Sequence, residues 1–186
     1  MNTPLPRRCN PRHAQAGVTL VEAAAVLAVV SIVAGLAVPS FERSIQRRHL
    51  EGAAAQLETD IHYTRSLAVA RNLPLRISFE SGADGASCYV IHTGAANQCR
   101  CTAGGEAVCD GTAQAERSVH FRAGGPVNLK SNSRSMLFDP LKGTSTPTAT
   151  VQLKTGTGMA IHQVTNIMGR VRSCSPAPAL SGYRAC

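Results

Sequence analysis

The stretch AGVTLVEAAAVLAVVSIVAGLAVP, residues 16–39, decides the architecture of this chain of 186 residues. Its central part, residues 18–38, is apolar and carries one charged side chain, Glu22. A helix of that length extends over about 30 Å, which matches the hydrocarbon thickness of a bilayer. The sequence therefore predicts a membrane-spanning helix close to the N-terminus.

The flank of this stretch predicts its orientation. Residues 1–17 contain Arg7, Arg8 and Arg12 and no acidic residue. The positive-inside rule places them in the cytoplasm and everything after the span outside the inner membrane. A signal peptide cleaved near AVPS (37–40) is the alternative. Glu22 argues against it, because a carboxylate inside a membrane is costly and usually has a partner.

The segment AGVTLVE resembles the cleavage motif of type IV prepilins, a Gly followed by an apolar segment with Glu at the fifth mature position. The resemblance implies that prepilin peptidase cuts between Gly17 and Val18 and that Val18 is then N-methylated. It also implies that Glu22 pairs with the terminal amine of a neighbouring subunit during assembly. Pro39 falls where pilins carry a helix-kinking proline. Val18 departs from the usual Phe, and the leader is longer than is typical.

The helix is expected to continue beyond the membrane as one element over 18–72, bent near Pro39. Asn72 and Pro74 are expected to end it. After the span, apolar residues recur with a period close to 3.6, which predicts that one helix face packs on a domain. These residues are Ile45, Leu50, Ala53, Ala54, Leu57, Ile61, Leu67 and Ala68.

The chain after Pro74 reads as β-structure. Short apolar or β-branched runs are separated by clusters of Gly, Asn, Asp, Pro and Ser. We expect strands over 75–79, 87–92, 117–121, 127–130, 135–138, 149–154, 158–164 and 166–173, with a polar loop at 141–150. The fold class predicted is α+β, an antiparallel β-domain covered by the second half of the helix.

Two segments, YTRSLAVARNLPLRISF (63–79) and GRVR (169–172), resemble the GspH/FimT group of minor pilins and pseudopilins, and FimT most closely. The resemblance does not extend over residues 85–125. It implies a type IV pilin-like fold with a leader (1–17), a transmembrane and assembly helix (18–44) and a periplasmic globular domain (45–186). The protein would lie in the inner membrane as a single-pass protein and then be extracellular in a pilus, with other major and minor pilins as partners.

The resemblance also implies a function. FimT proteins are minor type IV pilins implicated in DNA uptake during natural transformation, and a Gly-Arg-x-Arg motif in their basic C-terminal region is associated with DNA contact. Here the motif is Gly169, Arg170, Val171 and Arg172. We therefore expect binding of double-stranded DNA.

Charge counting supports this expectation independently of the resemblance. The net charge of +8 falls to +5 without the leader, and residues 40–125 hold nine basic and nine acidic side chains. Residues 126–186 hold seven basic residues and only Asp139, a net +6. Positive charge can serve an anionic partner or only solubility, and its concentration in one region favours the partner. The candidate DNA-binding residues are Lys130, Arg134, Lys142, Lys154, Arg170, Arg172 and Arg184.

The spacing of Arg170 and Arg172 predicts a phosphate-binding face. Residues two apart on a strand share a face about 6.6 Å apart, with Val171 directed to the core. Guanidinium groups bind phosphate in a bidentate way. The alternative is a solvated edge strand whose arginines prevent edge-to-edge pairing. Only Phe138 and Tyr183 are aromatic in this region, a poor platform for stacking single strands, so we expect salt-sensitive, sequence-independent contact with duplex.

The cysteines are expected to form disulfides outside the inner membrane. Cys9 would leave with the leader, and six cysteines would remain. Cys174 and Cys186 would close a C-terminal loop, as pilins often do. Cys88, Cys99, Cys101 and Cys109 would pair among themselves, and because Cys99 and Cys101 are too close to pair together, two arrangements remain open. Zinc is the weaker interpretation, and we expect no metal or cofactor.

No constellation of catalytic residues is present in the sequence. It contains no H-E-x-x-H, no G-x-S-x-G and no phosphate-binding glycine loop, so we expect no enzyme activity. The main alternative to a DNA receptor is a structural minor pilin or type II secretion pseudopilin that initiates filament assembly without touching DNA. Adhesion to an anionic surface is a third possibility.

Overall fold

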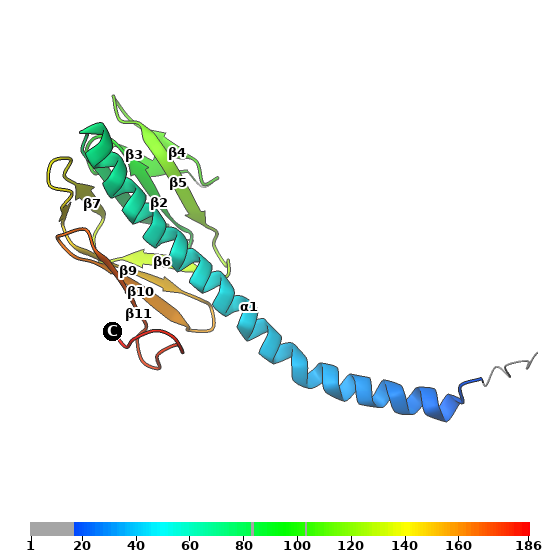
Figure 1. Ribbon diagram of the computed structural model, residues 1–186. Helices are drawn as coiled ribbons and strands as arrows, with labels where there is room; N and C mark the ends of the chain where they lie inside the picture. Colours follow the sequence, from blue (N-terminus) through cyan, green and yellow to red (C-terminus); the bar gives the residue numbers. More distant parts are fainter. Residues whose placement is uncertain (1–16, 83, 103) are drawn as a thin grey trace, which may run out of the picture. The chain divides into compact units, whose positions relative to one another are not determined.

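The computed structural model describes residues 17–82, 84–102 and 104–186 (Figure 1). These residues form one helix and eleven strands. The chain divides into two compact units, 1–42 and Arg43–Cys186, which are described separately below.

Helix α1 (Leu20–Arg71) is continuous over 52 residues, including residue 39. At its start the Glu22 N–H donates to Thr19 Oγ1 at 3.3 Å, so Thr19 caps the helix. At its end Asn72 has a φ of 49°, and the Leu73 N–H donates to the Ala68 carbonyl at 3.1 Å. This is the Schellman arrangement, so the predicted stop at Asn72 has a physical basis. The bend predicted near Pro39 stays a prediction.

The first unit contains the membrane-length part of α1. By length and composition α1 can cross a membrane, and the apolar window that meets this test is fully exposed. Val21, Leu27 and Ile32, for example, are largely exposed. An apolar helix exposed on all sides requires a lipid or protein environment, which is consistent with a single-pass pilin.

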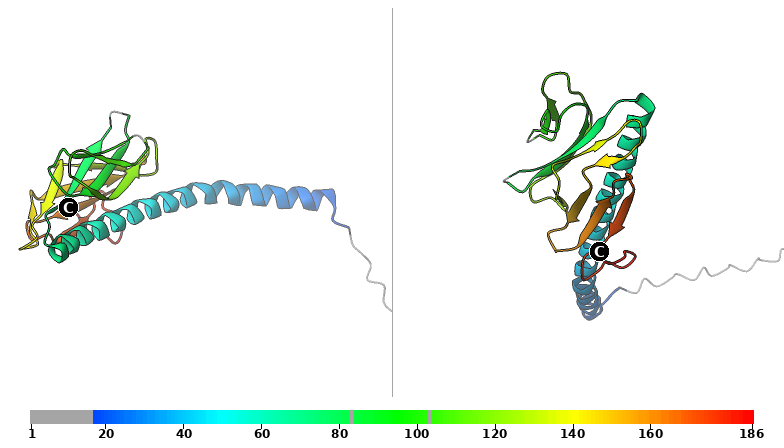
Figure 2. Two further views of the ribbon diagram at one scale, coloured as in Figure 1. Left: turned by 90° about the horizontal axis from the view of Figure 1, so that it is seen from above. Right: turned by 90° about the vertical axis from the view of Figure 1, so that its left-hand side faces the viewer.

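The second unit combines residues 43–71 of α1 with antiparallel sheets (Figures 1 and 2). Five strands pair in the order β5-β2-β1-β7-β8. Their bounds are β1 (Leu75–Ser81), β2 (Ser87–His92), β5 (Ala115–Phe121), β7 (Ser135–Phe138) and β8 (Ser145–Thr146). Four more, β6 (Asn128–Ser131), β9 (Ala149–Lys154), β10 (Ala160–Thr165) and β11 (Val171–Cys174), pair in the order β11-β10-β9-β6. The predicted pilin-like α+β fold is confirmed.

Two expectations about the helix and strands were wrong. Ile45 was expected on the packed face of the helix but is 39% exposed. The strand expected over 166–173 is shorter, because residues 167–169 form a turn and β11 begins at Val171. The strands β3 (Cys99–Cys101), β4 (Ala107–Cys109) and β8 were not expected, since runs of two or three residues leave no periodic signal.

One apolar core joins the helix to both sheets. Leu57 and Ile61 of α1 pack in it with Ile77 of β1 and with Val151 and Ile161 of the second sheet, and all five are fully buried. Burying a side chain of this size is worth about 1.5–3 kcal/mol. The core therefore fixes both sheets against residues 43–71 of the helix.

A buried charge also connects the helix to the first sheet. Asp60 is fully buried; it accepts hydrogen bonds from Gln56 Nε2 at 3.1 Å and the Tyr89 hydroxyl at 2.7 Å, and it forms an ion pair with Arg117. Desolvation by burial, reinforced by the bond to Asp60, raises the pKa of Tyr89. The ion pair between Asp60 and Arg117 was not predicted from the sequence, because Asp60 interrupts the apolar face of the helix.

A disulfide-bonded insertion covers the outer face of the first sheet. Disulfides join Cys88 to Cys101 and Cys99 to Cys109, which decides between the two arrangements left open by the sequence. Cys88 lies on β2, so the first bond fastens the β3-β4 hairpin to the sheet, while the second joins the paired hairpin strands to each other.

Candidate nucleic-acid interface

The β10-β11 hairpin presents the Gly-Arg-x-Arg motif. Thr165 and Val171 form the last strand pair, and beyond them the Asn166 N–H donates to the Arg170 carbonyl at 3.0 Å. The Arg170 N–H donates to Asn166 Oδ1, also at 3.0 Å, instead of to a backbone carbonyl. Arg170 therefore precedes β11 but still pairs with the opposite strand. Both Arg170 and Arg172 are exposed, and Val171 packs against the core.

Gly169 closes the turn of this hairpin. Its φ is 68°, and its N–H donates to the Asn166 carbonyl at 2.9 Å. A type I turn followed by a left-handed glycine is a common three-residue hairpin loop. A Cβ at this position would lie 3.1 Å from both Arg65 Cδ and the Gly143 carbonyl oxygen. Backbone conformation and limited space therefore both call for glycine.

The second sheet has a core face and a polar face. Val151 and Ile161 lie on the core face, where Gln163 Nε2 also donates to the Ala54 carbonyl of the helix at 3.0 Å. The strand register and the alternation of side chains place Lys130, Lys154 and Arg172 on the opposite face. Thr150, Gln152 and His162 share that face. We call this the basic face.

Lys142 and Arg170 lie together at one end of the unit. The β7-β8 loop carries Lys142 and leads into Ser145 of β8, whose N–H donates to the Ile167 carbonyl of the hairpin turn at 2.9 Å. Arg65 of the helix donates from Nε to the Gly143 carbonyl at 2.9 Å and lies beside Gly169. Arg65 was not among the candidate residues predicted from the sequence. The one signal near it was the resemblance of segment 63–79 to the GspH/FimT group.

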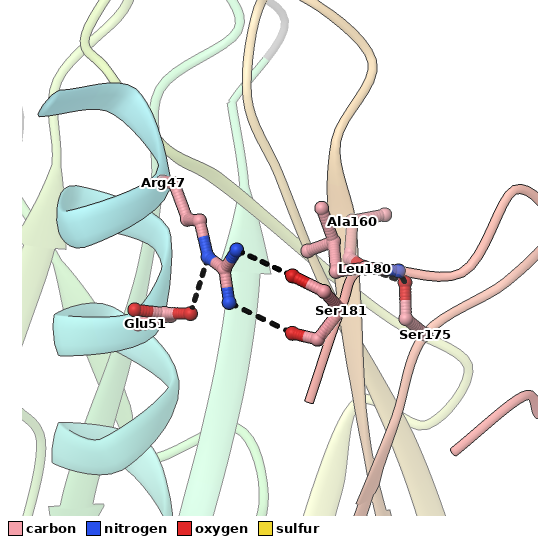
Figure 3. A network of polar contacts seen from close by, with 6 residues as sticks. All are labelled: Arg47, Glu51, Ala160, Ser175, Leu180 and Ser181. Carbon is pink, nitrogen blue, oxygen red and sulfur yellow. Dashed lines mark hydrogen bonds and ion pairs between the residues drawn. The ribbon is translucent and has the colours of Figure 1, made fainter. Parts of the chain in front are cut away.

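The C-terminal segment is held against the domain and not free. Cys174 and Cys186 form a disulfide, and the Ser175 N–H donates to the Arg184 carbonyl at 2.9 Å. Figure 3 shows Arg47 of α1 donating to Ser181 Oγ and to the Ser181 carbonyl, both at 2.7 Å, while its Nε contacts Glu51 at 2.8 Å. The backbone of Arg184 is therefore fixed beside Ser175, directly after the end of β11.

Arg134 has different surroundings from the other candidates. It lies in the β6-β7 turn, where its carbonyl accepts from the Phe79 N–H at 2.8 Å. Its side chain lines a cavity of about 720 Å³ together with Glu80, Asp84 and Arg100. Two carboxylates share this cavity, so we expect Arg134 to contribute less to anion binding than the candidates on the basic face.

All seven candidate cations are exposed, and none is neutralised by an ion pair among the described residues. The four ion pairs of those residues are Arg47–Glu51, Arg71–Glu116, Arg100–Asp110 and Arg117–Asp60. The basic side chains of the C-terminal third are thus not held in ion pairs and stay available to an external anion.

His162 sits among these cations without adding to their charge. Its Nε2 is buried and has no hydrogen-bond partner in the described chain. Burial, and then the positive charge of Lys154, lowers the pKa of His162. It lies beside Cys174 and Cys186, but their sulfur atoms are joined in the disulfide and are not thiolate ligands in this structure.

A Ser–His contact elsewhere in the unit has the features of a structural pair. Ser78 Oγ lies 2.8 Å from His92 Nε2, and His92 Nδ1 lies 2.7 Å from the Thr93 carbonyl. Both residues are buried, and burial lowers the pKa of His92. No carboxylate orients the imidazole, which a nucleophile–base arrangement uses. The absence of enzyme activity stays a prediction.

The residues implicated in processing precede or begin α1. Gly17 and Val18 are exposed before the helix, and Glu22 lies in its first turn, also exposed. Residues 1–16 of the expected leader lie outside the described residues. Cleavage, methylation and the subunit contact of Glu22 stay predictions.

A protein-family model described as type II transport protein GspH matches residues 53–168. The match covers more than half of the chain, from the packed half of α1 to the turn that precedes Gly169. No curated protein matches the chain. No solved structure matches it.

Proposed function

Because the chain belongs to the family of the type II transport protein GspH, which gives it a pilin or pseudopilin role, we propose that it is a minor type IV pilin that binds duplex DNA. In this proposal it resembles FimT and takes up extracellular DNA during natural transformation. The partners are double-stranded DNA, other pilins and the prepilin peptidase.

The observation that carries the proposal is the basic face and its continuation along β11. Lys130, Lys154 and Arg172 share one side of a rigid sheet, and Arg170 and Arg184 lie beyond the two ends of the same edge strand. Arg170, just before β11, and Arg172, within it, are two residues apart, about 6.6 Å in extended chain. Such a row of unpaired cations suits the regularly spaced phosphates of a nucleic acid backbone.

The mode of binding follows from the elements present. Among the described residues, the one helix packs in the core or carries the membrane-length segment, so no helix is available to enter a major groove. Phosphate contacts position a protein on DNA without reading its sequence. We expect binding that is strongly weakened by salt and nearly independent of base composition.

The proposed assembly route follows the pilin role. Cleavage between Gly17 and Val18 and N-methylation of Val18 would release the apolar helix of residues 18–44, and Glu22 would pair with a neighbouring subunit. The chain would lie in the inner membrane with residues 45–186 in the periplasm, and then be extracellular in the filament.

The first prediction concerns Arg170→Gln/Arg172→Gln in the full chain, held by its apolar helix in phosphatidylcholine nanodiscs. Each phosphate contact contributes about 0.9 to the slope of log affinity against log salt. The double variant should therefore lower that slope by about 1.8. The slope is measured by gel shift with a duplex of about 30 base pairs. The matched control is Arg48→Gln/Arg122→Gln, which removes two exposed arginines outside the basic face.

The printed family description favours a second function, that of a type II secretion pseudopilin that binds no DNA. The same experiment separates the two. If the wild-type chain and both variants bind equally weakly, the basic face serves only solubility, and the structural role stands alone.

A further inference from the structure

The three most exposed large apolar side chains in the described part of the Arg43–Cys186 unit belong to two neighbouring loops. Leu141 is 80% exposed, Ile167 58% and Met168 54%. The other large apolar residues exposed in that unit are all below half: Ile45, Tyr63, Val69, Leu73 and Val108. A single exposed apolar residue is ordinary, whereas a cluster marks an interaction surface.

The three residues belong to two loops that contact each other. Ser145 donates from its N–H to the Ile167 carbonyl at 2.9 Å and from Oγ to the Asn166 carbonyl at 2.7 Å. These bonds join the β7-β8 loop to the β10-β11 turn near the C-terminal end of α1 (Figure 2). We call Leu141, Lys142, Ile167, Met168 and Arg170 the tip.

Positive charge frames the apolar part of the tip. Lys142 follows Leu141 directly, and Arg170 follows Met168 by two residues. Arg65 lies against the backbone between the two loops, at Gly143 and Gly169. The nearby carboxylate of Asp139 accepts the N–H groups of Leu141 and Lys142, at 2.9 and 2.7 Å, so it orders the loop and offsets one of the three charges.

We propose that Ile167 and Met168 insert between stacked base pairs of duplex DNA, while Arg170 and Lys142 hold the flanking phosphates. This inference rests on the proposed function and adds to it a wedge, formed by the side chains of Ile167 and Met168, that bends the duplex. Apolar side chains inserted between base steps unstack them and kink the duplex by about 20–90°.

The charge of the tip favours this occupant over a second copy of the chain. A copy would bring a net positive charge, +5 without the leader, toward a surface that is itself positive. Duplex DNA offers a polyanionic exterior for the cations and an apolar base stack for the side chains between them. Insertion is least costly at flexible pyrimidine–purine steps, so we expect the kink to form at TA and CA steps while overall affinity stays nearly independent of sequence.

The experiment uses the full chain in phosphatidylcholine nanodiscs and a 30-base-pair duplex, a length at which one bend changes the end-to-end distance. The duplex carries a fluorophore pair at its ends and 2-aminopurine at a central TA step. The wild-type chain should raise energy transfer between the ends and raise 2-aminopurine emission, which reports unstacking. Ile167→Ser/Met168→Ser should lose both signals and weaken binding about tenfold with an unchanged salt slope, because no phosphate contact is lost.

Two variants serve as controls. Ile167→Leu/Met168→Leu should retain both signals, since the wedge needs only apolar volume. Val108→Ser, on the β3-β4 hairpin away from the tip, should behave as wild type.

The experiment distinguishes failure of the wedge from failure of the proposed DNA binding. Binding by the wild-type chain without bending or unstacking would overturn the wedge, and this readout needs no variant to fold. If Arg170→Gln/Arg172→Gln still lowers the salt slope in that case, the proposed DNA contact remains. Loss of binding to phosphatidylglycerol vesicles in the Ser double variant, with DNA binding unchanged, would also overturn the wedge and identify the tip as a lipid-binding surface.

Discussion

Gly169 is the residue on which the candidate interface depends most directly. Its left-handed backbone lets the chain turn from β10 into β11, and its missing side chain leaves room for Arg65 and the Gly143 carbonyl. The turn geometry alone thus explains the glycine of the Gly-Arg-x-Arg motif, without any contact to DNA. It sets the point at which Arg170 and Arg172 leave the turn.

The residue-scale prediction is that Gly169→Ala destabilises the Arg43–Cys186 unit by about 1–3 kcal/mol, the usual cost of a strained backbone. Gly156→Ala is the matched control, because a Cβ there meets nothing within 4 Å and its φ is not left-handed. Urea unfolding followed by circular dichroism measures both. Equal midpoints for the two variants would contradict the account of the turn.

Individual residues show why part of the site was not predicted from the sequence. Arg170 and Arg172 stood out because a motif and a charge count both marked them. Asp60 and Arg65 did not, because a charged residue on an amphipathic helix is ordinarily read as exposed. Asp60 is buried by its partners Tyr89 and Arg117, which lie far away in the sequence.

At the scale of elements, the C-terminal loop connects α1 to β10. The disulfide between Cys174 and Cys186 closes it, and Arg47 of α1 holds it through Ser181. Ser175 Oγ donates to the Ala160 carbonyl at 2.9 Å and accepts the Leu180 N–H at 3.1 Å, which attaches the loop to β10 (Figure 3). The end of the chain is therefore part of the folded unit.

We predict that Cys174→Ser/Cys186→Ser lowers the free energy of unfolding by about 3 kcal/mol, the value that loop-closure entropy gives for a loop of this size. Differential scanning calorimetry without reductant gives the loss. Adding reductant to the same variant then reports the two remaining disulfides and serves as the control. An unchanged melting temperature would mean that the contacts to Arg47 and Ala160 suffice to hold the loop.

Long and periodic elements were predictable, and short ones were not. The helix was expected at 18–72 and is Leu20–Arg71, because its cap residues and its period are both explicit in the sequence. β3, β4 and β8 were missed, since runs of two or three residues leave no periodic signal. Arg170 was placed on the last strand, whereas the three-residue turn leaves it just before β11.

At the scale of the whole molecule, charge and apolar surface are separated along the sequence. The membrane-length segment carries one acid, Glu22, and the excess positive charge that follows it lies in residues 126–186. This division matches a protein that is inserted in a filament by one end and meets its partner with the other. The family match supports the first half of that statement, and the basic face supports the proposal for the second.

The most direct test of the proposed function replaces the chain by its Arg170→Gln/Arg172→Gln variant in the strain that encodes it. DNA uptake and filament or secretion assembly are then measured in the same cells. Two phosphate contacts supply a large part of weak, non-specific affinity, so uptake should fall at least about tenfold while assembly stays intact. Unchanged uptake would contradict the central claim, and loss of assembly together with uptake would assign the two arginines to the filament.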